Sequence, residues 1–315
     1  MKLTIDNREI EARTGQTLLE LVKALGLDTD RLATRPLAAK IAGETFTLNY
    51  VPVRLKEELD PANPQRRAMA ASGGKIKLLH YCDNTGRDAY TRTVQFVLFL
   101  ALRQLYPGVT AKMNCTVGQG LYIQVMSDDF DAAALKDRVA RLIEEDIPLI
   151  RKRITTEQAI DYFRADGQED KARLLSYRTA PWFDVYTYGD FADYYYGEMM
   201  PSTGYITVWD IIPVDGGFMF IFPNPQNPDE LASFNQMPNF FRVFNEGERW
   251  CQLLDCATVA DLNELVDSGK IRELIRVNEA LHEKSYSQVA DMIIERGARA
   301  VMLAGPSSSG KTTSA

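Results

Sequence analysis

A glycine-rich segment near the end of this chain fits the pattern G-x-x-x-x-G-K-[ST], and an apolar run at 300–304 directly precedes it. The run is typical of a short buried strand. Glycines let successive backbone N–H groups turn inward around phosphate oxygens, while Lys311 would reach the terminal phosphates and Thr312 would ligate Mg²⁺. The pattern therefore predicts a strand, a phosphate-binding loop (P-loop) and a helix; the alternative is a Ser/Gly-rich tail. The residues predicted to bind ATP are Gly305, Pro306, Ser307, Ser308, Ser309, Gly310, Lys311, Thr312 and Thr313.

The chain of 315 residues ends three residues after Thr312. An enzyme that transfers phosphate from ATP also needs further strands, an acidic partner for Mg²⁺, a lid and an acceptor pocket. Domains take about 50–250 residues, so these parts do not fit into three. We therefore expect a piece of a longer protein, cut just inside a nucleotide-binding domain and inactive alone.

Composition and cysteine usage predict a globular, soluble, cytoplasmic protein. Hydrophobic residues make up 45% and charged residues 25% of the chain, which is ordinary for folded domains. The N-terminus does not read as a signal peptide, and no apolar stretch reaches the roughly 18–20 residues of a membrane span. The net charge of −7 disfavours general binding to a phosphate backbone, so we expect tRNA not to be a partner. Cys82, Cys115, Cys251 and Cys256 lie far apart and form no C-x-x-C pair, so we expect no zinc and reduced thiols; the alternative is two disulfides.

Residues 1–83 are predicted to form a β-grasp, or ubiquitin-like, module. Apolar and polar residues alternate on both sides of Asp6-Asn7, which predicts a hairpin with one buried face. Thr17 and Glu20 have the spacing of a capping box at the start of a helix. Strand-like runs at 38–41, 45–51 and 76–80 complete the order of hairpin, helix and strands.

The rest of the chain is predicted to be an α+β domain at 88–255, followed by a helical segment at 257–315 that leads into the P-loop. The pattern in the α+β domain favours helices at 94–106, 132–145 and 156–163, a strand at 121–125 and further strands over 182–222. Apolar stripes at 271–282 and 285–296 predict helices in the last segment. The predicted fold class of the whole chain is therefore α+β.

Three parts of the chain resemble known domains. Residues 1–80 resemble the TGS module at the N-terminus of threonyl-tRNA synthetases. Residues 88–250 resemble the editing-type domain of the same enzymes, most clearly in Ala101-Leu-Arg-Gln-Leu-Tyr-Pro107 and Gly120-Leu-Tyr122. Residues 270–315, with the run 277–282 and the P-loop, resemble the start of a uridine kinase or phosphoribulokinase-type domain. The family that joins all three is the TGS-containing uridine (nucleoside) kinases.

This resemblance implies an ATP-dependent kinase with Mg²⁺ as cofactor and a nucleoside, uridine or cytidine, as acceptor. The synthetase-like domains would then be regulatory or ligand-sensing. The resemblance does not decide the oligomeric state. The alternative is a non-catalytic module, related to threonyl-tRNA synthetase, that binds RNA or a small ligand.

The editing domain of the synthetases uses an H-x-x-x-H pair and a later C-x-x-x-H pair. The anchor at residues 105–107 aligns these four positions with Arg92, Phe96, Tyr195 and Met199. Phenylalanine offers no donor, arginine is cationic and a thioether binds Zn²⁺ poorly, so we expect neither a metal nor deacylation of mischarged tRNA. A cleft with an arginine at its rim suits a small anionic or aromatic ligand. The nearby tyrosines predict either a core or a surface that stacks on a ligand: Tyr186, Tyr188, Tyr194, Tyr195 and Tyr196.

Overall fold

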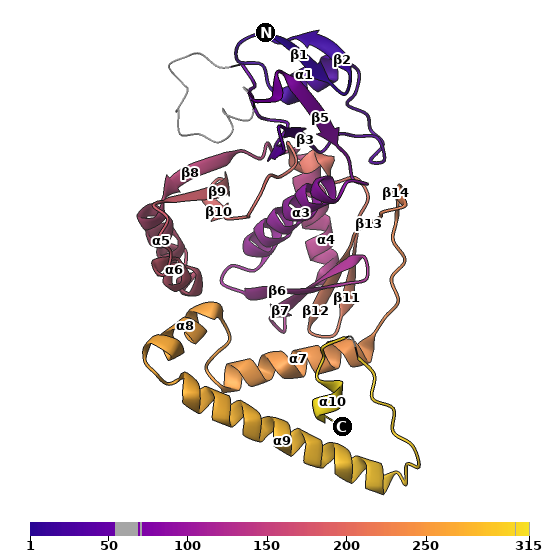
Figure 1. Ribbon diagram of the computed structural model, residues 1–315, viewed down its shortest axis with the longest axis vertical. Coiled ribbons are helices and arrows are strands. Elements are labelled where there is room, and N and C mark those ends of the chain that lie inside the picture. Colours follow the sequence, from indigo (N-terminus) through magenta and orange to yellow (C-terminus); the bar gives the residue numbers. More distant parts are fainter. Residues whose placement is uncertain (54–68, 70, 306, 315) are drawn as a thin grey trace.

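The computed structural model describes residues 1–53, 69, 71–305 and 307–314, and its secondary structure is mixed α+β, as predicted. Figure 1 shows a small N-terminal sheet at one end, two further sheets with their helices in the middle, and a group of helices at the other end. Among the helices of the described part, none is long and apolar enough to cross a membrane.

The N-terminal sheet has the β-grasp strand order. In space its strands follow as β2 (Arg8–Glu11), β1 (Lys2–Ile5), β5 (Lys75–Leu79), β3 (Ala38–Ile41) and β4 (Glu44–Phe46). Strand β1 pairs antiparallel with β2 and parallel with β5. Asp6 and Asn7 have φ angles of 43° and 67°, the left-handed conformation that a type I′ hairpin turn requires at both central positions.

The capping box at Thr17 is formed, and it begins helix α1 (Leu18–Ala24). The Thr17 hydroxyl accepts from the Glu20 backbone N–H at 3.2 Å, and the Glu20 carboxylate accepts from the Thr17 N–H at 2.9 Å. The helix buries its apolar stripe in the same core as Leu3 and Ile5 of the sheet. Local capping and apolar alternation thus position the first core.

The central sheet is antiparallel and has a buried core on each face. Its strands, in spatial order, are β11 (Asp210–Val214), β12 (Gly217–Ile221), β7 (Gly120–Met126) and β6 (Thr110–Val117). Residues such as Ile123 and Phe220 pack on one side with helices α3 (Asn84–Leu105) and α4 (Ala132–Glu144). Tyr122 and Met219 pack on the other side with Phe241 of α7 (Pro238–Leu253). Burial on both faces explains why β12 is a continuous apolar run.

A smaller sheet stands beside the central one and carries two helices. Its strands are β10 (Phe191–Asp193), β9 (Trp182–Tyr188) and β8 (Arg151–Thr155), and its helices are α5 (Thr156–Ala165) and α6 (Glu169–Ser176). Phe163 and Phe183 anchor a separate core between these elements. Near the central sheet, the 3₁₀ turn Thr203–Tyr205 and the short hairpin β13 (Pro223–Asn224) and β14 (Asn227–Leu231) complete the middle of the molecule.

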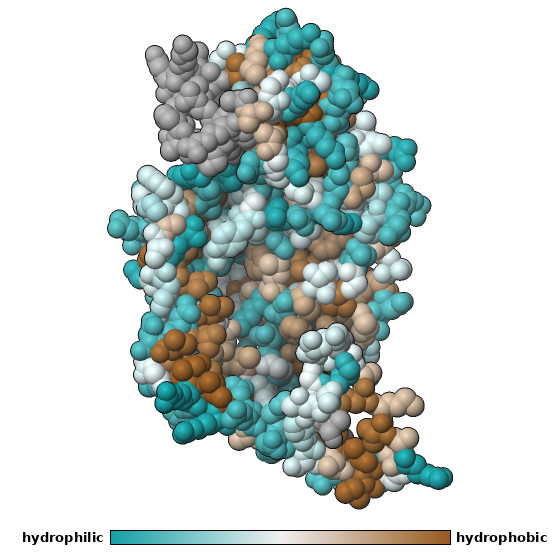
Figure 2. Space-filling model, viewed as in Figure 1, coloured by the Kyte–Doolittle hydropathy of each residue, from teal (hydrophilic) through white to brown (hydrophobic). Residues whose placement is uncertain are grey.

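The last helices are the most exposed part of the structure. Helix α8 (Val259–Asp267) is followed by α9 (Ile271–Glu295), which is one continuous helix where the sequence predicts two apolar stripes, and α9 has no buried residue. Figure 2 shows apolar atoms gathered at the lower right, where Figure 1 places the end of α9 and the segment after it.

The predicted strand at 300–304 is not formed. Val301, Met302 and Leu303 have exposed fractions of 60%, 94% and 53%, and the segment belongs to none of the sheets of the described residues. A buried strand needs neighbours that pair with its backbone and cover its side chains, and the described part of the chain places none beside it. The expected strand at the entrance to the P-loop is therefore wrong for this structure.

Candidate functional site

Helix α3 presents two of the four aligned editing positions on one face, because residues at i and i+4 lie one turn apart. Arg92 donates from Nη1 to the Glu198 carbonyl oxygen at 3.1 Å. Between the two positions, the Thr93 hydroxyl accepts from the Met200 N–H at 3.0 Å and donates to the Ala89 carbonyl at 2.9 Å. These bonds hold the segment 195–200 against α3.

The structure brings the four aligned positions together, but two of them are packing residues. Phe96 and Met199 are fully buried. The Phe96 ring lies 5.4 Å from the Phe191 ring and 6.4 Å from the Tyr195 ring, centroid to centroid. Among the residues that the structure describes, no group of three or more His, Cys, Asp or Glu side chains could hold a metal ion. The expectation that no zinc binds here stays a prediction.

Tyr195 carries a buried hydroxyl that has no hydrogen-bond partner among the described residues. Burial raises its pKa well above the usual range of a tyrosine, because the phenolate form would lose its contact with water. An unpaired buried hydroxyl costs about 1–3 kcal/mol relative to a paired one. The position of Tyr195 beside a cavity offers a reason for this cost.

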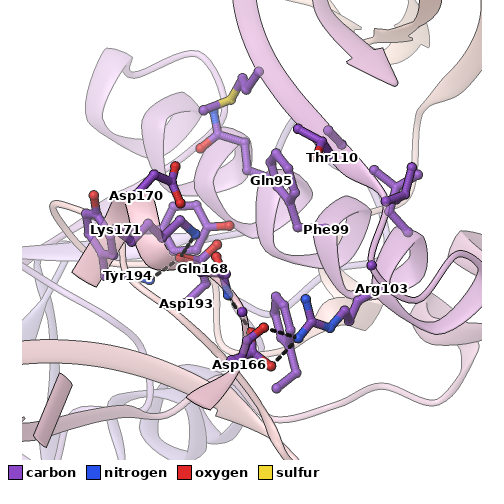
Figure 3. Close-up of a pocket in the computed structure, with 18 of the residues that line it drawn as sticks. Gln95, Phe99, Arg103, Thr110, Asp166, Gln168, Asp170, Lys171, Asp193 and Tyr194 are labelled. Atoms are coloured by element: carbon purple, nitrogen blue, oxygen red, sulfur yellow. Dashed lines mark hydrogen bonds and ion pairs between the residues drawn. The ribbon is translucent and has the colours of Figure 1, made fainter. Parts of the chain in front are cut away.

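Tyr195 lines a cavity of about 820 Å³ between helix α3, the start of β6, the turn from α5 to α6, and the segment after β10. Figure 3 shows Lys171, Asp193 and Tyr194 on one side of this cavity and Phe99 and Arg103 on the other. The cavity is also lined by Arg92, Gln95, Asp166, Gln168, Asp170, Phe191 and Tyr196.

Four of the six charged side chains at the cavity form two ion pairs across its walls. Arg103 forms an ion pair with the Asp166 carboxylate and also donates to the Asp166 carbonyl oxygen at 2.9 Å. Lys171 Nζ lies 2.8 Å from Asp193 Oδ1, which also accepts from the Tyr194 N–H at 2.8 Å. Each pair joins residues 22 or more positions apart in the chain. The pairs therefore fix the shape of the cavity.

Sequence reasoning identified Arg92 and the tyrosines but missed most of the cavity. Gln95, Phe99 and Arg103 follow Arg92 at helical spacing, so the face of α3 could have revealed them. Nothing in the local pattern indicates Lys171, since its place in the cavity depends on the packing of α6 beside β10. Tyr186 is a core residue that donates to the Gly197 carbonyl at 3.2 Å, while Tyr188 binds the Glu145 carboxylate at 3.0 Å.

The predicted P-loop lies at the other end of the molecule from the N-terminal sheet (Figure 1). Lys311 begins the short helix α10 (Lys311–Ser314) and donates from Nζ to the Gly305 carbonyl oxygen at 3.0 Å. Ser308 and Gly310 have φ angles of 61° and 77°. The side chains of Ser307, Ser308, Ser309, Thr312 and Thr313 are exposed, and Pro306 lies outside the described residues. Binding of ATP by this loop, and of Mg²⁺ by Thr312, stays a prediction.

Comparison with curated proteins finds threonine–tRNA ligases. The chain is 26% identical over 224 residues to the threonine–tRNA ligase of Parabacteroides distasonis, which covers 69% of this chain and 31% of the relative. It is 27% identical over 227 residues to that of Natranaerobius thermophilus and 26% identical over 227 residues to that of Ligilactobacillus salivarius. The chain spans about a third of the length of these relatives. No family model matches the chain.

These relatives confirm the resemblance to threonyl-tRNA synthetases and correct the predicted function. The prediction of a uridine or nucleoside kinase is wrong, because the relatives that match over two thirds of the chain are named threonine–tRNA ligases and not kinases. The predicted nucleoside partners are wrong for the same reason. The expectation that tRNA is not a partner, which rested on net charge alone, is corrected as well.

Proposed function

We propose that this chain is a non-catalytic tRNA-binding module related to part of the threonine–tRNA ligases. The observation that carries the proposal is the similarity to these ligases over 69% of the chain. Net charge does not oppose it, since a protein of net charge −7 can still bind a phosphate backbone through a local group of cations. We also propose a cytoplasmic location, in keeping with the four free cysteines of the structure.

The absence of catalysis is proposed from the side chains at the four aligned positions. Arg92 donates a hydrogen bond to the Glu198 carbonyl oxygen, and Phe96 and Met199 are buried in the core. Hydrolysis of an ester needs a base or a metal-bound water that can reach the ester carbonyl. Arginine, phenylalanine and methionine supply neither, so we expect binding without deacylation.

Fluorescence anisotropy with a labelled threonine tRNA transcript tests the proposal, with a tRNA of another acceptor type and an unrelated RNA hairpin as controls. We expect saturable binding that prefers tRNA to the hairpin. If about two phosphates are contacted, affinity should fall about tenfold between roughly 50 and 200 mM salt. Equal binding to all three RNAs, or no saturation at about 100 µM protein, would contradict tRNA recognition.

A second assay follows the release of serine and of threonine from charged tRNA. We expect the rate with the chain to equal the rate in buffer. Hydrolysis that rises with protein concentration, and that Arg92→Ala abolishes, would show that the module is catalytic.

A further inference from the structure

The cavity at Tyr195 is lined by a residue whose buried hydroxyl has no hydrogen-bond partner among the described residues. The Tyr195 hydroxyl is buried and unpaired, and it belongs to a side chain that lines a cavity of about 820 Å³. Native proteins leave few buried hydroxyls unsatisfied. A ligand atom that accepts or donates a hydrogen bond in the cavity would complete this group.

Three cations and three carboxylates line the cavity, and two of the cations keep unused hydrogen-bond donors. The carboxylate of Asp166 is engaged at both oxygens, by Arg103 and by Gln168 Nε2 at 2.6 Å. Lys171 has three donors and uses one on Asp193, and the five-donor guanidinium of Arg92 makes one bond within the described structure.

Two further groups at the cavity can donate to an acceptor on the ligand. The Gln95 side-chain amide makes no hydrogen bond among the described residues. Burial raises the pKa of Tyr194 to about 12, and its neutral hydroxyl can donate as well. A ligand rich in acceptor oxygens is therefore matched better than one rich in donors. Two carboxylates oppose an anion there: Asp170, which is exposed at the cavity, and Asp193, whose Oδ2 makes no hydrogen bond among the described residues.

Aromatic side chains form much of the remaining wall. Phe99, Phe191, Tyr194 and Tyr196 line the cavity together with Tyr195. The Lys171 ammonium lies 5.7 Å from the centroid of the Tyr194 ring, so a cation stands beside an aromatic face. Aromatic walls favour a flat apolar body through offset or edge-to-face ring contacts. The two sets of groups together select a planar ring that carries an acceptor-rich substituent.

We propose that this cavity binds a small aromatic anion, a planar ring bearing a carboxylate or a phosphate. The ring lies against the aromatic wall, the anionic oxygens accept from the free donors of Lys171 and the arginines, and the Tyr195 hydroxyl donates to the ligand. No bond is made or broken. The proposal stands apart from tRNA recognition, so failure of either binding assay leaves the other result intact.

Isothermal titration calorimetry at pH 7 with four simple probes tests the chemistry. Benzoate and phenyl phosphate carry the ring with either anion, benzamide is the neutral counterpart of benzoate, and acetate has the charge without the ring. We expect one site that binds benzoate or phenyl phosphate at least tenfold more tightly than benzamide or acetate. The better of the two identifies the anionic group. Equal affinity for benzamide, or no saturable binding of either aromatic anion up to about 10 mM, overturns the proposal.

Three variants assign the binding to this cavity. Tyr195→Phe should weaken the anion about fivefold, because one hydrogen bond is lost and the ring is kept. Lys171→Met should weaken the anion about tenfold and leave benzamide unchanged. Lys136→Met is the matched control, since Lys136 is paired with Asp210 and does not line the cavity. Thermal unfolding of each variant reports that it is folded. Unchanged affinity in both cavity variants, or an equal loss in the control, overturns the site.

Discussion

Glu198 is a carboxylate that the fold removes from water. Its exposed fraction is 4%, and its carboxylate meets Arg151 Nη1 at 3.0 Å. Burial raises the pKa of Glu198 above the ordinary value of a glutamate, while the Arg151 guanidinium opposes the rise. The folded protein thus holds this proton to a higher pH than the unfolded chain does.

We expect Glu198→Gln to change how stability depends on pH. The stability contributed by the protonated acid is present below the pKa of the unfolded chain, about 4.3, and is lost as the pH rises through the higher folded pKa. Wild type should therefore lose stability relative to Glu198→Gln as the pH rises from about 4. Urea unfolding at a series of pH values measures the difference. A difference that stays constant, or that grows in favour of wild type, would contradict the raised pKa.

Tyr195 and Tyr186 allow a matched test of how much a hydrogen bond to a tyrosine hydroxyl contributes to stability. The Tyr195 hydroxyl has no partner among the described residues, whereas the Tyr186 hydroxyl donates to the Gly197 carbonyl at 3.2 Å. We expect Tyr195→Phe to raise the free energy of unfolding by about 1 kcal/mol and Tyr186→Phe to lower it by about 1 kcal/mol. Denaturant unfolding without ligand measures both. Equal destabilisation by the two changes would show that Tyr195 has a partner in solution.

At the scale of elements, α3 and α9 show how tertiary contacts govern helices of similar length. Helix α3 has 22 residues and buries eleven of them: Gly86, Ala89, Tyr90, Thr93, Val94, Phe96, Val97, Leu98, Leu100, Ala101 and Leu102. Helix α9 has 25 residues and buries none. The sequence predicts a helix at 94–106, yet α3 begins at Asn84. Its first two turns lack a strong apolar stripe and are helical because they pack on neighbours.

Gly86 in the first turn of α3 gives a direct test of this packing. A Cβ at Gly86 would collide with the carbonyl oxygen of His80, while one at Gly247 in α7 would meet no atom within 4 Å. Helix propensity alone favours alanine over glycine by about 1 kcal/mol at both sites. We expect Gly247→Ala to gain up to about 1 kcal/mol and Gly86→Ala to lose about 2 kcal/mol or more, because the collision outweighs the propensity. Thermal and urea unfolding compare the two, and a gain at both sites would show that α3 shifts freely.

At the scale of the whole molecule, the N-terminal β-grasp and the middle of the chain are joined by a shared core. Leu37, directly before β3, and Leu79 of β5 pack in the same core as α3. Asn49 donates from its amide to the carbonyl oxygens of Leu149 and Pro201 at 3.1 and 2.7 Å. These contacts connect residues 100 and 152 positions apart. We therefore expect the two parts to unfold together.

Substitution of Asn49 tests this connection. Asn49→Ala removes two donors and should cost about 1–2 kcal/mol, while Asn49→Asp places a carboxylate against two carbonyl oxygens and should cost more. Urea unfolding followed by circular dichroism and tryptophan fluorescence measures the loss. In wild type we expect the unfolding transitions followed by circular dichroism and by tryptophan fluorescence to coincide. In a variant with a sufficiently weakened junction, we expect these two transitions to separate. Equal stability of all three proteins would show that the junction contributes nothing.

Local patterns were sufficient wherever a feature depends on residues close in the chain. The Asp6-Asn7 turn, the Thr17 capping box and the side-chain types at Arg92, Phe96, Tyr195 and Met199 follow from spacing and chemistry alone. Net charge and an eight-residue motif were poor guides to the function of the chain, because neither reports what most of the chain resembles.

Contacts between distant residues decided the rest. The exposed state of 300–304 follows from the lack of neighbouring strands in the described structure, although its composition is that of a buried strand. The cavity exists because α6 packs beside β10 and brings Lys171 to Asp193, and because α3 closes the opposite wall. Burial, pairing and an unsatisfied hydroxyl are properties of neighbours in space, and residues that are far apart in sequence become neighbours only when the whole chain has folded.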